Sequence, residues 1–293
     1  MRRHKLDGVL LLDKPVGPSS SAVLQAVKRL LNAEKAGHAG TLDPLASGLL
    51  QLLFGEATKF AQFGLDAAKE YVADVRLGTA TDTGDAEGAV IEQRPVAVDE
   101  NRLAQALAGF RGEISQVPPM YSALKKDGQP LYALARAGQT VERESRRITV
   151  YELELVSRGE DRLRLRIRCS KGTYVRQLAA DLGLALGTVA HLAALRRTAV
   201  GGQRLDQAVS LDDLQALGEA ARRAWILPPD RMLDHLPRVD LDPVLAGRFR
   251  NGQAVRLEGV AQGPLRVYQE GRLLGVGEGG PGSELLPVRL IAG

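Results

Sequence analysis

Strands and helices are predicted to follow one another along this chain without a regular strand–helix repeat. Residues 8–15 begin with an apolar run and end at a proline, as a buried strand does, and residues 70–80 alternate apolar and polar side chains. Residues 148–157 and 161–169 alternate in the same way on either side of a tight connection. This order favours the α+β class, with a mixed, mainly antiparallel sheet.

Helices are predicted between these strands. In residues 22–34 the apolar side chains recur at helical spacing, and Ser20 or Ser21 is expected to cap the first turn. Residues 99–110 have the same character, with Asp99 near the cap.

The chain is predicted to contain two domains. Its 293 residues exceed the usual size of one domain, and residues 226–240 are rich in proline and charge, as linkers often are. Beyond this stretch, short strands separated by glycine turns predict a small β-barrel over residues 238–293. We therefore expect a larger domain over residues 1–230, followed by the barrel.

Composition excludes several classes of protein and of site. The single cysteine rules out an internal disulfide and a multi-cysteine zinc site, and the four histidines are too scattered to form a metal site. No apolar run approaches the roughly 18 residues of a transmembrane helix, so we expect no membrane partner and a cytoplasmic protein. The net charge of +4 allows a nucleic-acid partner without requiring one.

The most unusual stretch of the chain is residues 37–50, GHAGTLDPLASGLL. Its glycines permit close backbone approach, and Pro44 pushes the backbone of Asp43 toward an extended conformation. Asp43 could then present its carboxylate to a cavity. In the alternative interpretation, Asp43 only caps a short helix that begins at Pro44. The glycine spacing is not that of a phosphate-binding loop.

A second candidate is residues 169–183, CSKGTYVRQLAADLG. A helix is expected to begin near Thr173, which could cap it and would place Arg176 in the first turn. A cation there opposes the helix dipole at a cost on the order of 0.3–1 kcal/mol, which a carboxylate would offset. Asp43 is the partner we expect; in the alternative, Arg176 points to solvent.

The segment around Asp43 closely resembles the active-site motif of the TruB family of tRNA pseudouridine-55 synthases. Further segments resemble those of this family and occur in the family order: LDKPVGPSS (12–20), GEATKF (55–60), KEYVADVRLGTATDTGDAEG (69–88), QVPPMYSALKKDGQPLYALAR (116–136), CSKGTYVRQLAADLG (169–183) and AHLAALRRTAVG (190–201). Residues from about 238 onward resemble, more faintly, the PUA domain, a small RNA-binding β-barrel.

The resemblance implies the fold of the pseudouridine synthase catalytic domain and the reaction of that family. The bond between ribose C1′ and uracil N1 breaks, the base turns, and C5 becomes the new point of attachment. The target base must leave its stack before this can happen. No cofactor and no metal are implied.

The resemblance also assigns roles to three catalytic residues. Asp43 matches the carboxylate that acts at the sugar–base junction. Arg176 matches the arginine that pairs with this aspartate and orients it. Tyr71 matches the tyrosine that stacks on the target base, and its hydroxyl is a candidate acceptor for the C5 proton. From the residues alone, Tyr71 could equally be a core side chain on the face of its strand.

Five further residues match family positions that contact the substrate. His38 matches the residue that replaces or packs against the extruded nucleotides. Tyr174 and Leu195 match positions that line the uracil pocket, and Lys59 and Asp85 match positions near the active-site entrance.

The expected partner is transfer RNA, bound through its T stem-loop and modified at position 55. We expect a monomer that needs no obligate protein partner. Two other functions stay open at this point: a helper of tRNA folding that binds without chemistry, and a guide-RNA-dependent pseudouridine synthase with the same motif.

Overall fold

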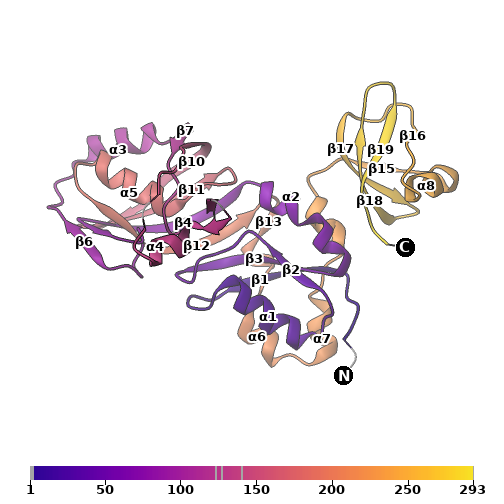
Figure 1. The fold of residues 1–293 in the computed structure, drawn as a ribbon, viewed down its shortest axis with the longest axis horizontal. Helices are drawn as coiled ribbons and strands as arrows, with labels where there is room; N and C mark the ends of the chain where they lie inside the picture. The colour runs from indigo at the N-terminus through magenta and orange to yellow at the C-terminus, as the bar shows by residue number, and fades with distance from the viewer. Residues whose placement is uncertain (1–2, 123, 127, 140, 293) are drawn as a thin grey trace.

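The computed structural model describes residues 3–122, 124–126, 128–139 and 141–292 (Figure 1). One large sheet forms its centre, with the strand order β14 (Val209–Ser210), β1 (Gly8–Lys14), β3 (Ala46–Phe54), β12 (Ala190–Val200), β4 (Lys69–Leu77), β11 (Arg162–Cys169), β10 (Arg146–Arg158) and β7 (Gly112–Gln116). Short strands pair beside this path or with each other: β13 (Gln203–Arg204) with β12, β2 (Ala36–Ala39) with β3, β5 (Thr79–Thr81) with β6 (Val90–Gln93), and β8 (Lys125–Lys126) with β9 (Gln129–Pro130).

The large sheet is mixed and mainly antiparallel, which confirms the predicted fold class. Strand β12 runs parallel to β3, and β14 runs parallel to β1, whereas the other neighbours along the path are antiparallel. The parallel pair sets Leu195 of β12 opposite Ala46 and Arg197 opposite Gly48. The connection before β3, which carries Asp43, therefore lies close to the middle of β12.

Helices cover the sheet in two groups. Their bounds are α1 (Ser20–Leu30), α2 (Ala61–Asp66), α3 (Glu100–Gly109), α4 (Leu131–Arg136), α5 (Val175–Ala185), α6 (Leu211–Ala216), α7 (Glu219–Ala224) and α8 (Pro243–Arg250), with 3₁₀ turns η1 (Gly55–Phe60), η2 (Leu205–Gln207) and η3 (Pro229–Leu233). In Figure 1, α3 and α5 lie over the end of the sheet formed by β10, β11 and β4, and α1 and α6 lie beside β1 and β3.

The alternation predicted for residues 70–80 is confirmed in β4. Its odd-numbered side chains from Tyr71 to Leu77 are buried on one face, under α3 and α5. Burying a side chain of the size of Val75 or Leu77 contributes roughly 1.5–3 kcal/mol to stability. The same pattern leaves Asp74 on the outer face, where it pairs with Arg164.

Two predicted helix caps are wrong, and each error involves a residue of the later site. Helix α1 is capped by Ser19, whose hydroxyl accepts from the Ala22 N–H, whereas Ser20 is buried and bonded elsewhere. Thr173 does not cap α5, because its hydroxyl donates to Ser170 O. Asp99 does cap α3, as predicted.

The C-terminal part forms a separate curled sheet, drawn in yellow in Figure 1. Its strand order is β15 (Arg238–Asp240), β17 (Gly263–Gln269), β18 (Arg272–Gly279), β19 (Glu284–Leu290) and β16 (Val255–Arg256), with α8 packed against it. The curled sheet is a half-barrel and corresponds to the predicted small PUA-like barrel.

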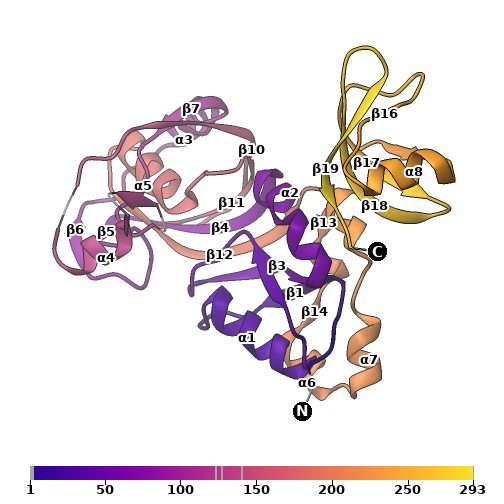
Figure 2. The same ribbon diagram turned by 45° about the vertical axis from the view of Figure 1, so that its right-hand side comes forward.

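The stretch predicted as a linker is packed rather than free. Met232, Leu233 and Leu236 are buried in one apolar cluster that also contains Leu11 of β1 and Tyr268 of β17. Apolar side chains therefore connect the large sheet with the C-terminal sheet. In Figure 2, the strands of the C-terminal sheet lie to the right of α2 and the large sheet.

Hydrogen bonds reinforce this joint. The Tyr268 hydroxyl donates to Asp230 at 2.6 Å, and the Ala292 N–H donates to Glu56 of η1 at 2.6 Å. Lys59 of η1 donates to the Leu290 carbonyl at 2.9 Å.

Candidate functional site

A cavity of about 340 Å³ lies where the β2–β3 connection, β4, β12 and the start of α5 meet. Five of the predicted site residues line it: Asp43, Tyr71, Tyr174, Arg176 and Leu195. These residues come from four separate parts of the chain, and the fold brings their side chains together around one cavity.

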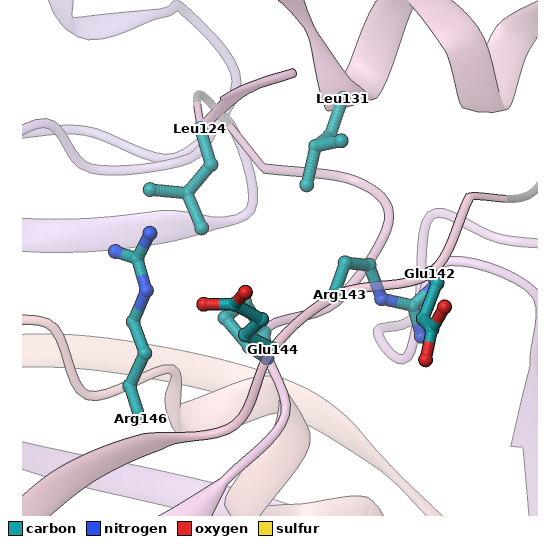
Figure 3. A pocket seen from close by; sticks show the side chains of 7 residues that line it. Leu124, Leu131, Glu142, Arg143, Glu144 and Arg146 are labelled. Carbon is teal, nitrogen blue, oxygen red and sulfur yellow. The ribbon is translucent and has the colours of Figure 1, made fainter.

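Another cavity, of about 400 Å³, lies beside α4 and the start of β10 (Figure 3). Leu124 and Leu131 lie on one side of it, and a charged segment that includes Arg143, Glu144 and Arg146 lies on the other. None of the predicted site residues line this cavity. The cavity at Asp43 is therefore the candidate active site.

The backbone around Asp43 is held by buried polar side chains. Ser20 of α1 both accepts from the Leu42 N–H and donates to the Leu42 carbonyl, each at 2.9 Å. Lys14 is fully buried and donates to the Ala46 carbonyl at 2.8 Å. Burial lowers the pKa of Lys14, while the nearby Asp43 acts in the opposite direction.

Asp43 does not cap a helix, which excludes the alternative interpretation of its segment. The residues after it form a turn, in which the Ala46 N–H donates to the Asp43 carbonyl at 3.0 Å. The side chain is 49% exposed and reaches the cavity. A carboxylate in this position is accessible to a bound substrate.

Arg176 pairs with two carboxylates. One Nη atom lies 3.0 Å from Asp43, and Nε lies 3.5 Å from Asp85. Its guanidinium also donates to the carbonyls of Thr83 and Tyr121. The predicted Asp43–Arg176 pair is therefore present, and Arg176 does not point to solvent, because its side chain is 8% exposed.

Asp85 is buried behind Arg176 rather than placed at the cavity entrance. Its carboxylate accepts from the Thr83 hydroxyl at 2.6 Å and from the Glu87 N–H at 3.1 Å, and its side chain is 5% exposed. Removing one partner of such a buried pair leaves an uncompensated charge, at a cost of about 3–5 kcal/mol. Asp85 therefore positions Arg176.

Tyr71 faces a second arginine across the strands. In the antiparallel pairing of β4 with β12, Tyr71 lies opposite Arg197, and both side chains line the cavity. Burial raises the pKa of the Tyr71 phenol, whereas the charge of Arg197 acts to lower it.

Lys69 lies two residues before Tyr71 and lines the same cavity. Its ammonium group donates to the carbonyls of Leu65 and Ala67. Burial, followed by the charge of Arg197, lowers the pKa of Lys69 to about 8.

Other walls of the cavity come from Tyr174, Leu195 and Ser122. The Tyr174 backbone is held from both sides by the Gln116 side chain, which accepts from its N–H at 2.8 Å and donates to its carbonyl at 3.1 Å. The buried Ser122 hydroxyl has no hydrogen-bond partner among the described residues. It is available to a polar group of a ligand.

Besides Asp85, two predicted site residues lie away from the cavity lining, His38 and Lys59. His38 is on β2, where its Nδ1 is buried and has no partner within the described part of the chain. Burial and the charge of Arg197 lower the pKa of His38. Lys59 pairs with Glu56 at 2.7 Å and reaches Leu290, so it lies at the joint to the C-terminal sheet.

The sequence interpretation did not identify Lys69, Arg197, Lys14 or Ser20 as parts of the site. A usable signal existed for Arg197, because it follows Leu195 at the two-residue spacing of a strand and so shares its face. No comparable signal existed for Ser20, because its contact with Leu42 depends on the tertiary packing of α1.

The described ranges contain no group of three or more His, Cys, Asp or Glu side chains arranged to hold a metal ion. Within the same ranges, no helix is long and apolar enough to cross a membrane.

Three family models match successive parts of the chain. Residues 28–175 match the TruB family pseudouridylate synthase (N terminal domain), and residues 176–234 match the tRNA pseudouridylate synthase B C-terminal domain. Residues 237–291 match the C-terminal model of pseudouridine synthase II TruB.

Curated relatives match over almost the full length. A tRNA pseudouridine synthase B from Azoarcus sp. (strain BH72) is 54% identical, with 99% of this chain and 96% of the relative covered. A tRNA pseudouridine synthase B from Burkholderia mallei (strain NCTC 10247) is 56% identical, with 99% of both chains covered.

A solved structure described as a Cbf5-Nop10-Gar1 complex contains a similar chain, with a TM-score of 0.76 and 30% identity, covering 99% of this chain and 85% of the other. A second, an H/ACA RNP bound to a substrate RNA containing 2′-deoxyuridine, gives a TM-score of 0.73 at 27% identity, covering 97% and 84%. With these matches along its whole length, the chain belongs to the TruB family of pseudouridylate synthases.

Proposed function

We propose that this protein converts uridine 55 in the T loop of transfer RNA to pseudouridine. The C1′–N1 bond breaks, a C1′–C5 bond forms, and C5 loses the proton that N1 gains after exchange with water, so no oxidant, reductant or second substrate is needed. The observation that carries the proposal is the Asp43–Arg176 ion pair, 3.0 Å long, in a cavity that also presents Tyr71.

Asp43 is the proposed catalytic carboxylate at the sugar–base junction. It is the acid in the cavity whose oxygen is both held by a guanidinium and exposed to a ligand. A carboxylate fixed in this way can act on a developing cationic sugar without first being ordered. Arg176 orients it, and the buried Asp85 holds Arg176 from behind.

Tyr71 is proposed to stack on the flipped base and to accept the C5 proton. Tyr174 and Leu195 would line the uracil pocket, where a low dielectric strengthens the few polar contacts. A bidentate polar edge such as that of uracil would also meet the unpartnered Ser122 hydroxyl.

His38 is proposed to contact the RNA beside the flipped nucleotide, because it matches the family position that packs against the extruded nucleotides and lies half-buried on β2. For Lys59 the bonds to Glu56 and Leu290 support a structural role at the joint instead of a contact at the entrance.

We further propose that residues 1–230 are the catalytic domain and that residues 238–293 add an RNA-binding PUA-like domain. The separate sheet order of the C-terminal strands supports this division. The protein is proposed to act in the cytoplasm as a monomer, without an obligate protein partner, cofactor or metal.

The test is mass-spectrometric mapping of pseudouridine in a bare T stem-loop transcript incubated with the purified chain. Conversion at position 55 is expected without any guide RNA and in the presence of EDTA. If the transcript were modified only after addition of a guide RNA or a partner protein, the proposal of an autonomous tRNA enzyme would be wrong.

The variant Asp43→Asn distinguishes a role in tRNA folding from catalysis. Asp43→Asn should yield no pseudouridine. A refolding assay with misfolded tRNA then shows whether binding alone has an effect.

A further inference from the structure

Arg197 is a buried cation that forms no ion pair with a described carboxylate. Its side chain is 1% exposed, Nε donates to the Leu49 carbonyl at 2.7 Å, and Nη2 donates to the Gly40 carbonyl at 2.8 Å. Burying an unpaired charge costs several kcal/mol, so its position requires compensation by well-placed dipoles. Both carbonyls belong to the segment that carries Asp43.

Two glycines of this segment pack closely against Arg197. A Cβ at Gly48, where φ is +102°, would lie 2.2 Å from the Arg197 carbonyl oxygen. A Cβ at Gly40, where φ is +75°, would lie 3.3 Å from one of its Nη atoms. The segment from Gly40 to Gly48 is thus shaped around the backbone and the guanidinium of Arg197.

Tyr71 is the cross-strand neighbour of Arg197. The two residues are directly opposite in the β4–β12 pairing, and both line the cavity. Arg197 therefore bonds the carbonyls that flank Asp43 in sequence and lies beside Tyr71 on the same face of the sheet.

We propose that Arg197 is a positioning residue that holds the Asp43 segment and the Tyr71 phenol at a fixed separation across the cavity. The expected effect on catalysis rests on the proposed function. The arrangement of Arg197 beside the Asp43 segment and Tyr71 does not depend on that function. Arg197 acts through Tyr71 and the backbone, and Arg176 acts through Asp43.

The charge of Arg197 also favours the ionised form of Tyr71. The charged or titratable groups that act on this phenol are Arg197 from β12, Cys169 from the end of β11 and Asp43 from the β2–β3 connection. Arg197 is the one cation among these three, and the other two act to raise the pKa of Tyr71. Loss of Arg197 should therefore raise that pKa further, since no cation would offset burial.

The kinetic test compares Arg197→Gln and Arg197→Lys with the wild type and with Tyr71→Phe, using tritium release from a T stem-loop labelled at uridine C5. Arg197→Gln is expected to lower kcat on the order of 100-fold with KM changed by less than about threefold. Arg197→Lys, which keeps the charge, should recover part of the loss. Arg164→Gln is the matched control, because Arg164 pairs with Asp74 on the outer face of the strand that carries Tyr71.

A double-mutant cycle separates positioning from general destabilisation. Because part of the effect of Arg197 acts through Tyr71, the loss of activity in the double variant Tyr71→Phe/Arg197→Gln should be smaller than the product of the two single losses. If the two losses multiply, or if Arg197→Gln and Arg197→Lys lose activity only in proportion to the fraction unfolded by circular dichroism, the proposal is overturned. Should Arg197→Gln not fold, the same cycle is run with Arg197→Lys.

A spectroscopic experiment measures the titration of Tyr71 directly and needs no RNA. The protein is labelled with 3-fluorotyrosine, whose phenol is more acidic than that of tyrosine, and the fluorine signal absent in Tyr71→Phe is assigned to Tyr71. Its titration should move to higher pH in Arg197→Gln and stay unchanged in Arg164→Gln. Equal titration in the wild type and Arg197→Gln contradicts the inference. An inactive wild type with the expected shift contradicts the proposed function alone.

Discussion

The cavity has two ends that are built with opposite charges. At the carboxylate end, two acids, Asp43 and Asp85, lie against one guanidinium, that of Arg176. At the phenol end, the guanidinium of Arg197 acts on the phenol of Tyr71, and Lys69 lines the same cavity. The first arrangement holds a carboxylate in place, and in the second the charge of Arg197 partly offsets the rise that burial causes in the pKa of Tyr71.

The two ends also differ in exposure. The Asp43 side chain is 49% exposed, whereas Tyr71 as a residue is 9% exposed and Arg197 is 1% exposed. A group that acts on the sugar must be reachable from the entrance, while a proton acceptor works best where water is excluded. The comparison shows that one cavity can hold an accessible carboxylate near its entrance and a buried phenol farther inside.

The largest expected effect breaks the carboxylate end. Asp43→Asn should lower kcat by at least about 10⁴-fold, because the amide cannot replace an ionised oxygen at the sugar. Single-turnover tritium release measures the loss, and filter binding should show RNA affinity within a few-fold of the wild type. Full turnover by this variant would remove Asp43 from the mechanism.

Asp85→Asn tests whether a carboxylate that only positions Arg176 is needed as well as the catalytic carboxylate of Asp43. The substrate does not need to touch Asp85, yet its loss leaves Arg176 with one carboxylate that is half-exposed. We expect kcat to fall on the order of 100-fold to 1,000-fold, in line with the few kcal/mol of a broken buried pair. An unchanged kcat would mean that Asp43 alone orients Arg176.

Gly48→Ala disturbs the phenol end through the backbone. A Cβ would lie 2.2 Å from the Arg197 carbonyl at a φ of +102°, so the free energy of unfolding should fall by about 2–3 kcal/mol. Urea unfolding measures the change. Gly109→Ala is the control, since its Cβ meets no atom within 4 Å; it should leave stability unchanged or raise it.

The smallest predicted effect concerns Lys69 and pH. Its pKa in the folded protein is lowered to about 8 from the ordinary 10.5, so between these values the unfolded chain binds more protons than the folded one. Stability contributed through Lys69 must then rise as pH increases through this window.

Urea unfolding at pH 8 and pH 9.5 tests this sign. The wild type should gain roughly 1 kcal/mol relative to Lys69→Met over the interval. A parallel change in both proteins would show that Lys69 titrates normally.

Local patterns predicted the sheet well because each strand carries its own signal. The alternation of β4 fixed which of its side chains are buried, Tyr71 included. The Asp43–Arg176 pair was also predictable, because a cation in the first turn of α5 calls for an acid. The family resemblance added the catalytic role of that acid and the position of Tyr174.

What was missed depends on long-range packing. Ser20 has the sequence context of a helix cap, and only the approach of α1 to Leu42 turns its hydroxyl toward the Asp43 segment. The bonds of Lys59 to the far end of the chain are equally invisible in its neighbours in sequence. The proline-rich stretch before the C-terminal sheet has the composition of a flexible connection, but its apolar residues find partners on both sides.

The packed joint also bears on how the protein could select its target nucleotide. Since Leu233 and Tyr268 belong to one apolar cluster, the half-barrel packs against the large domain, and this contact sets its distance from the cavity in the structure. If the half-barrel binds RNA as proposed, an RNA bound at both places would have its target nucleotide selected by its distance along the stem. A base pair inserted between the two binding places should then bring the wrong nucleotide to the cavity.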